Sequence, residues 1–174
     1  MKRLLLLRHA KASQETSEGD HARPLAGRGR RNAPAMGKAM RKAGYVPGHV
    51  LCSGAARTRE TWELVAQELK TKPEVAFTDA LYLAPWKTIL KLACMLPDTT
   101  EAVMMIGHNP GMEDCAAALL GDTSDAAERA RREDLASKFP TGALAVIDCD
   151  VESWAQLAPG CGALTDFIKP RNLD

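Results

Sequence analysis

A run of four leucines, Leu4 to Leu7, follows the first three residues of the sequence and strongly limits how the chain can fold. A strand with one solvated face alternates apolar and polar side chains, because only its other face is covered. A continuous apolar run of this length is instead typical of a strand buried on both faces of a parallel sheet. The run therefore predicts an α/β protein in which both faces of the sheet are covered.

The following chain alternates between strand-like and helix-like segments. Three short apolar runs predict further strands, at residues 49–52, 75–77 and 102–106. Four segments with apolar residues at helical spacing predict helices, at residues 29–42, 55–69, 86–96 and 110–120. This alternation predicts a three-layer α/β/α sandwich with a mostly parallel central sheet.

The C-terminal part of the sequence is less regular. The charged segment 124–138 predicts a solvated helix or a mobile excursion, and residues 143–147 and 154–157 predict a closing pair of strands. The tail, residues 163–174, can add a segment at the edge of the sheet. Because no repeat or linker divides the sequence, we expect one domain that spans residues 1–174.

Composition narrows the class of protein. A formal net charge of +1 gives no reason to expect a nucleic-acid partner, which would call for a clustered basic stripe. The five cysteines have neither disulfide-scaffold nor zinc-site spacing, and reduced thiols suit a cytoplasmic protein. The leucine run is too short for a signal peptide or a membrane span. We therefore expect a cytoplasmic protein without a membrane partner, and the oligomeric state stays open.

Four basic or imidazole side chains follow the ends of predicted strands: Arg8, His9, Arg57 and His108. In open α/β sheets, ligands bind in the crevice beyond the carboxyl ends of the strands. Two arginines and two histidines beside a helix N-terminus suit a compact dianion such as phosphate. One imidazole can attack phosphorus while the other stabilises charge. The other two histidines, His21 and His49, lack this placement, and we interpret them as structural.

These residues belong to motifs that follow one another along the chain: Arg8-His9-Ala10-Lys11, Arg23-Pro24-Leu25, Ser53…Arg57-Thr58…Thr61 and Gly107-His108-Asn109-Pro110-Gly111. Together the motifs resemble the histidine phosphatase (phosphoglycerate mutase-like) superfamily. The short chain and the Arg-Pro-Leu step look most like its SixA-type phosphohistidine phosphatase branch. The resemblance implies a phosphoglycerate mutase-like fold and a phosphatase that needs neither a metal nor another cofactor.

The resemblance also implies a role for each matching residue. His9 would be the nucleophile, which carries the phosphoryl group in a covalent intermediate. Arg8 and Arg57 would hold the phosphoryl oxygens, and His108 would donate to the same group in the transition state. Three further candidates for substrate binding are Asp20, Arg23 and Asn109. The expected substrate is a phosphorylated protein or a small phosphorylated molecule.

The sequence departs from the family after the third predicted strand. Many phosphomonoesterase and mutase members carry a glutamate acid there, whereas this chain has Asp79-Ala80-Leu81-Tyr82-Leu83-Ala84. An alkoxide leaving group needs a proton donor, whereas the labile P–N bond of a phosphoramidate is less demanding. The missing acid therefore favours protein phosphohistidine as the substrate. Asp20, and less directly Asp79, are the candidates for a compensating acid.

Several other functions share parts of this pattern. A small-molecule phosphomonoesterase of the same superfamily and a non-catalytic phosphohistidine-binding module would both use the same cluster. A cysteine-based phosphatase would need five residues between its cysteine and arginine, but Cys52 and Arg57 are separated by four. We therefore interpret Cys52 as a buried strand residue. The Ser53 segment does not match the G-x-S-x-G motif of serine hydrolases.

Overall fold

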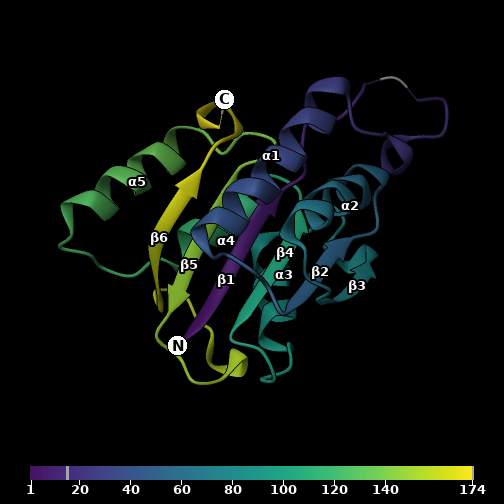
Figure 1. Cartoon of the computed structure of the whole chain (residues 1–174). Helices are drawn as coiled ribbons and strands as arrows, with labels where there is room; N and C mark the ends of the chain where they lie inside the picture. The colour runs from purple at the N-terminus through teal and green to yellow at the C-terminus, as the bar shows by residue number, and fades with distance from the viewer. Residues whose placement is uncertain (15, 174) are drawn as a thin grey trace.

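The computed structural model of the protein describes residues 1–14 and 16–173 (Figure 1). Six strands form one sheet in the order β3-β2-β4-β1-β5-β6. Their bounds are Lys2–Arg8 (β1), His49–Ser53 (β2), Glu74–Thr78 (β3), Ala102–Gly107 (β4), Leu144–Cys149 (β5) and Gly162–Ile168 (β6). Strands β3, β2, β4 and β1 pair in parallel, whereas β5 runs antiparallel to both β1 and β6. The expected mostly parallel sheet is confirmed.

Helices cover both faces of this sheet. Their bounds are Gly27–Ala43 (α1), Ala56–Leu69 (α2), Trp86–Cys94 (α3), Gly111–Leu119 (α4) and Ala126–Ser137 (α5). Helices α1 and α2 lie together in front of the sheet in Figure 1, α3 and α4 lie behind it, and α5 flanks β6. The molecule is therefore the three-layer α/β/α sandwich that the alternation of segments predicts.

The leucine run occupies the middle of the sheet, between β4 and β5. All four side chains are at most 1% exposed. Leu4 and Leu6 belong to the core cluster that contains apolar residues of α3 and α4, whereas Leu5 and Leu7 belong to the cluster with residues of α1 and α2. The period of two along a strand explains this division. The prediction of a strand buried on both faces is confirmed.

The predicted strand at residues 154–157 is wrong. Residues Trp154–Gln156 form a short 3₁₀ turn, and the partner of β5 is β6, which lies in the tail that we expected at the sheet edge. Asp98 accepts a hydrogen bond from the Trp154 backbone N–H at 2.8 Å, and the Thr100 carbonyl accepts one from its indole N–H at 3.1 Å. The buried Trp154 ring fills the core from this turn. Its apolar character therefore reflects core packing and not a strand.

The charged segment 124–138 contains helix α5, which is anchored to the sheet. Glu128 in this helix is 6% exposed and accepts hydrogen bonds from Thr123, Arg132 and the backbone N–H of Leu164 in β6. These bonds satisfy the buried carboxylate and bind the helix to the edge strand. Of the two alternatives for this segment, the structure therefore shows the helix.

The structure also bears on the cysteines and on whether a helix could cross a membrane. All five cysteines are free thiols, and three of them are buried. Within residues 1–14 and 16–173, every helix is too short or too polar to cross a lipid bilayer.

Candidate active site

Three strand ends bring the predicted catalytic residues together. Arg8 ends β1 and pairs with Gly107 at the end of the neighbouring β4, so that His9 and His108 follow adjacent strands. The His9 backbone N–H donates to the Gly107 carbonyl at 3.1 Å, which fixes this junction. Arg57 lies in the first turn of α2, just beyond the end of β2. The carboxyl ends of the parallel strands thus meet at one edge of the sheet, as expected.

A pocket of about 320 Å³ lies at this edge. All the predicted site residues line it: Arg8, His9, Asp20, Arg23, Arg57, His108 and Asn109. Lys11, Gln14, Leu83 and Thr141 also line it, although sequence analysis did not assign a role to them. Among the residues that the structure describes, no group of three His, Cys, Asp or Glu side chains is placed to hold a metal ion. The lining of the pocket is rich in cationic side chains and imidazole rings.

The surroundings of His9 suit the nucleophile that the sequence predicts. Its ring is buried, and Nδ1 lies 2.7 Å from the carbonyl oxygen of Ala10. Because a carbonyl oxygen only accepts, Nδ1 carries the proton and Nε2 keeps its lone pair. Burial, followed by the positive charges of Arg57 and Arg8, lowers the pKa of His9 to about 4. The imidazole is therefore neutral at physiological pH, with Nε2 available for attack.

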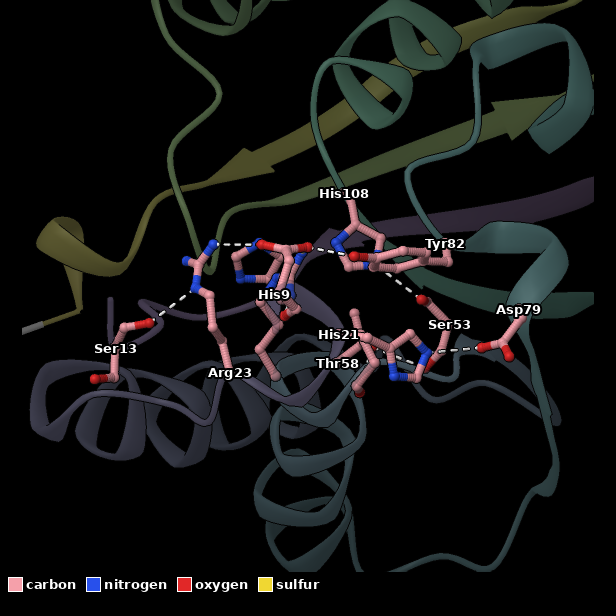
Figure 2. A network of polar contacts seen from close by, with 12 residues as sticks. His9, Ser13, His21, Arg23, Ser53, Thr58, Asp79, Tyr82 and His108 are labelled. Atoms are coloured by element: carbon pink, nitrogen blue, oxygen red, sulfur yellow. Dashed lines mark hydrogen bonds and ion pairs between the residues drawn. The ribbon is translucent and has the colours of Figure 1, made fainter. Parts of the chain in front are cut away.

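His108 faces His9 across the site, with 5.4 Å between the ring centroids. Its Nε2 lies 2.8 Å from the hydroxyl oxygen of Ser53, while its buried Nδ1 has no hydrogen-bond partner among the described residues (Figure 2). Ser53 is fully buried and its hydroxyl has no other acceptor among the described residues, so we assign the hydroxyl as the donor to Nε2; the ring proton then lies on Nδ1 and is free for a ligand. Burial, followed by the neighbouring His9, lowers the pKa of His108 to about 3. His108 is therefore a neutral hydrogen-bond donor.

Both arginines keep a hydrogen-bond donor in reserve. Arg57 is 3% exposed and donates to the carbonyl and the carboxylate of Asp20, at 2.7 and 3.0 Å. Arg8 donates to the Phe139 carbonyl at 3.0 Å. The Nε atom of each guanidinium is buried and lacks a partner within the described part of the chain. Because buried donors in native structures are normally paired, these two N–H groups indicate a place for an anionic ligand.

Asp20 lies among cations and is not suited to donate a proton. Its carboxylate accepts hydrogen bonds from the Tyr82 hydroxyl, from Arg23 at 2.8 Å and from Arg57 at 3.0 Å. The Tyr82 hydrogen bond, together with those from the two arginines, holds the pKa of Asp20 well below its usual range. The group is ionised at neutral pH, so the idea that Asp20 replaces the missing acid does not fit this environment.

The other candidate acid, Asp79, is absent from the residues that line the pocket. Its carboxylate lies 2.9 Å from Nε2 of His21 and is largely exposed (Figure 2). The His21 ring in turn contacts Tyr82 at 4.8 Å between centroids. Tyr82 keeps its proton, because the hydrogen bond to Asp20 raises the pKa of its phenol. The segment after β3 thus offers a tyrosine beside the site but no acidic proton donor.

Cys52 is a buried residue of β2, as interpreted from the sequence. Burial raises the pKa of its thiol to about 12, and the thiol donates to the Ser53 carbonyl. A thiol attacks phosphorus only as the thiolate, which is scarce at neutral pH when the pKa is this high. The structure therefore gives no support to a cysteine-based phosphatase.

Comparisons with known proteins agree with this geometry. Residues 4–81 match the family model described as the histidine phosphatase superfamily (branch 1). An uncharacterized protein of Mycobacterium tuberculosis (strain H37Rv) is 32% identical over 165 residues, which are 95% of this chain and 100% of the relative.

Two solved structures have the same fold at similar identity. A candidate phosphohistidine phosphatase SixA from Nakamurella multipartitia is 30% identical, with a TM-score of 0.82 over 97% of this chain and 96% of the other. A candidate SixA from Agrobacterium tumefaciens is 31% identical, with a TM-score of 0.79 over 97% and 98% of the two chains. With the family match and these likenesses over nearly the whole chain, the protein belongs to the histidine phosphatase superfamily, branch 1.

Proposed function

We propose that the protein is a phosphohistidine phosphatase, which removes the phosphoryl group from histidine side chains of another protein. One observation carries the proposal. A neutral imidazole, His9, lies among three buried N–H groups that lack partners in the described structure: Nε of Arg8, Nε of Arg57 and Nδ1 of His108. This is the arrangement that phosphoryl transfer needs, a nucleophile beside preorganised donors for the phosphoryl oxygens.

The first chemical step forms a covalent intermediate. Nε2 of His9 attacks phosphorus, a new N–P bond forms, and the P–N bond to the substrate imidazole breaks. A substrate ring that is protonated on its other nitrogen leaves as neutral imidazole, so this step needs no acid from the enzyme. Arg8, Arg57 and His108 stabilise the charge on the phosphoryl oxygens.

Hydrolysis of the intermediate follows the same logic. Nδ1 of His9 keeps its proton, which it donates in a hydrogen bond to the Ala10 carbonyl, and the phosphorylated ring is therefore an imidazolium, which is a good leaving group. Water attacks phosphorus, the N–P bond breaks, and the ring returns to neutral imidazole. Both protons of the water leave on the phosphate product, so the cycle closes without a further proton donor.

The environment of the site also supports the substrate class. Asp20 is ionised, and Tyr82 holds its proton tightly, so that neither group readily protonates an alkoxide leaving group. A sugar phosphate needs such protonation, whereas phosphohistidine does not. The likeness to two candidate SixA phosphohistidine phosphatases at 30% and 31% identity points to the same substrate class.

A comparison of substrates tests the proposal. We expect the purified protein to hydrolyse a phosphohistidine peptide with a kcat/KM about 10²-fold or more above that for a sugar phosphate, as one missing general acid typically costs. An aryl phosphate should fall between them, because a phenolate leaves more readily than an alkoxide. Equal rates on the sugar phosphate and the peptide would favour a small-molecule phosphomonoesterase. Tight binding of the peptide without turnover would favour a non-catalytic phosphohistidine-binding module.

The lowered pKa values of His9 and His108 predict that both rings gain their second proton at an unusually low pH. An ordinary histidine titrates near 6.5, whereas the pKa of His9 is about 4 and that of His108 about 3. Both rings should therefore stay neutral as the pH falls from about 8 to about 5.5, and they should gain protons only below that. Ring-proton NMR spectra of the unliganded protein would show this, with His9→Ala used to assign the signal. A His9 signal that titrates near the ordinary histidine pKa, at about pH 6 to 7, would contradict the expectation.

A further inference from the structure

A second pocket, of about 480 Å³, lies beside the active site. The start of α1, the segment that follows α5 and residues 169–171 line it. Thr141 lines both pockets and so forms a common wall between them, two residues after Phe139. This wall is attached to the catalytic site, because the Phe139 carbonyl accepts hydrogen bonds from Arg8 at 3.0 Å and from Asn109 at 3.2 Å. A ligand that extends from the catalytic site over Thr141 therefore enters the second pocket.

The lining of the second pocket is strongly basic. It contains five cationic side chains and no aspartate or glutamate: Arg28, Arg31, Lys138, Lys169 and Arg171. Lys169 is buried and already neutralised by Asp134, which lies 2.5 Å from its Nζ. The other four are exposed, and none of them forms an ion pair within the described residues. Four uncompensated cations at one place stand out in a chain whose formal net charge is only +1.

The form of the pocket indicates the kind of anion it accepts. A single phosphate is usually held by converging donors with fixed geometry, such as paired guanidinium N–H groups or backbone amides. Here the free cations are exposed side chains that come from three separate segments: Arg28 and Arg31 from α1, Lys138 from the end of α5 and Arg171 from the C-terminal turn. Long side chains spread in this way suit several carboxylates along a polypeptide.

We propose that this basic pocket binds an acidic segment of the substrate protein, next to the phosphohistidine that enters the active site. The inference rests on the proposed function, and it specifies in addition that the substrate protein is acidic around its phosphohistidine. Complementary charge in an exposed pocket of this kind acts mainly on the rate of encounter and on the choice of partner. The pocket would therefore select acidic phosphoproteins over neutral ones without taking part in the chemical steps.

Two matched phosphohistidine peptides test the inference, one with Asp and Glu flanking the phosphohistidine and one with Asn and Gln in their place. For the unchanged protein at low salt, we expect kcat/KM to be about tenfold higher for the acidic peptide, with the advantage shrinking as salt is added. The double variant Arg31→Glu/Arg171→Glu should lose this advantage. Turnover of a small aryl phosphate should stay the same, because neither residue lines the catalytic pocket.

Lys42→Glu provides a matched control. Lys42 is an exposed cation on the same helix as Arg31, about 16 Å farther along the axis, and it is absent from both pockets. Lys42→Glu changes the charge by as much as the single variant Arg31→Glu does, and it should keep the preference for the acidic peptide, whereas Arg31→Glu should weaken that preference. If the double glutamate variant also loses aryl phosphatase activity, Arg31→Gln/Arg171→Gln replaces it, since it removes the positive charges without adding negative ones.

Several outcomes would overturn the inference. Equal kcat/KM for the acidic and neutral peptides would do so, as would a preference that survives in the double variant. If the double variant loses activity only on a small molecule that carries two phosphates, and not on the acidic peptide, the pocket binds a second phosphate instead. If neither peptide is hydrolysed, the proposed function fails. The basic pocket can then still be tested by measuring the binding of the unphosphorylated acidic peptide by fluorescence anisotropy. Weaker binding to Arg31→Glu than to Lys42→Glu, which changes the charge equally, supports an acidic ligand in the pocket, and equal binding to the two variants contradicts it.

Discussion

Replacing His9 with alanine is expected to abolish turnover of phosphohistidine, with kcat lowered by about 10⁴-fold or more, as when the nucleophile of a covalent mechanism is removed. The donors Arg8, Arg57 and His108 would remain, but they stabilise a phosphoryl group that has no acceptor. Turnover of a phosphohistidine peptide by the variant and by the unchanged protein measures the effect.

The covalent intermediate gives this prediction a second measurement. Brief incubation of the unchanged protein with a substrate labelled in its phosphoryl group should label the enzyme. The label should be lost in acid and survive alkali, as expected for a phosphorylated imidazole, and His9→Ala should acquire none. His49→Gln is a suitable control, because His49 begins β2, at the opposite end of the strand from the site. Full activity in His9→Ala would refute the mechanism.

The central part of the fold could be predicted because its signals are local. Each buried parallel strand is a short apolar run, and each is followed by a helix whose apolar residues recur at helical spacing. The positions of Arg8, His9 and His108 follow from this pattern, since carboxyl ends of parallel strands share one edge of the sheet. For these residues, local sequence and global topology agree.

The strand predicted around Trp154 failed because local apolar character does not distinguish a strand from a turn that fills the core. The deciding contacts come from Asp98 and Thr100, which precede Trp154 by more than fifty residues, as the sequence separations of 56 and 54 show. These contacts satisfy the backbone and indole N–H groups of a buried ring. Nothing in residues 154–157 alone shows that such partners exist.

The neighbours of the predicted catalytic residues could not be identified from the sequence for the same reason. Tyr82 and Asp20 meet across 62 residues, and this hydrogen bond is the largest cause of the lowered pKa of Asp20. Ser53 was part of a recognised motif, but its hydrogen bond to His108 depends on the pairing of β2 with β4. Protonation states depend on burial and on long-range partners, and therefore they require the folded structure.

Arg57→Ala is expected to lower kcat on phosphohistidine by about 10²- to 10³-fold, the usual effect of removing one preorganised donor from a transition state. Arg57 is almost completely buried and keeps its Nε without a partner in the described structure, so water cannot easily replace it. Arg57→Lys should recover only part of the activity, because an ammonium group supplies charge without the planar set of donors.

Arg59→Ala is the matched control for Arg57→Ala. Arg59 lies two positions farther along α2, where it donates to the Gly54 carbonyl and stacks on Phe77, and it is absent from the catalytic pocket. Thermal unfolding of both variants would separate lost stability from lost catalysis. The assigned role requires kcat itself to fall, since a donor that strengthens in the transition state lowers the barrier after the substrate is bound. A rise in KM with unchanged kcat would instead limit Arg57 to binding the ground state, and charge stabilisation would then rest on Arg8 and His108.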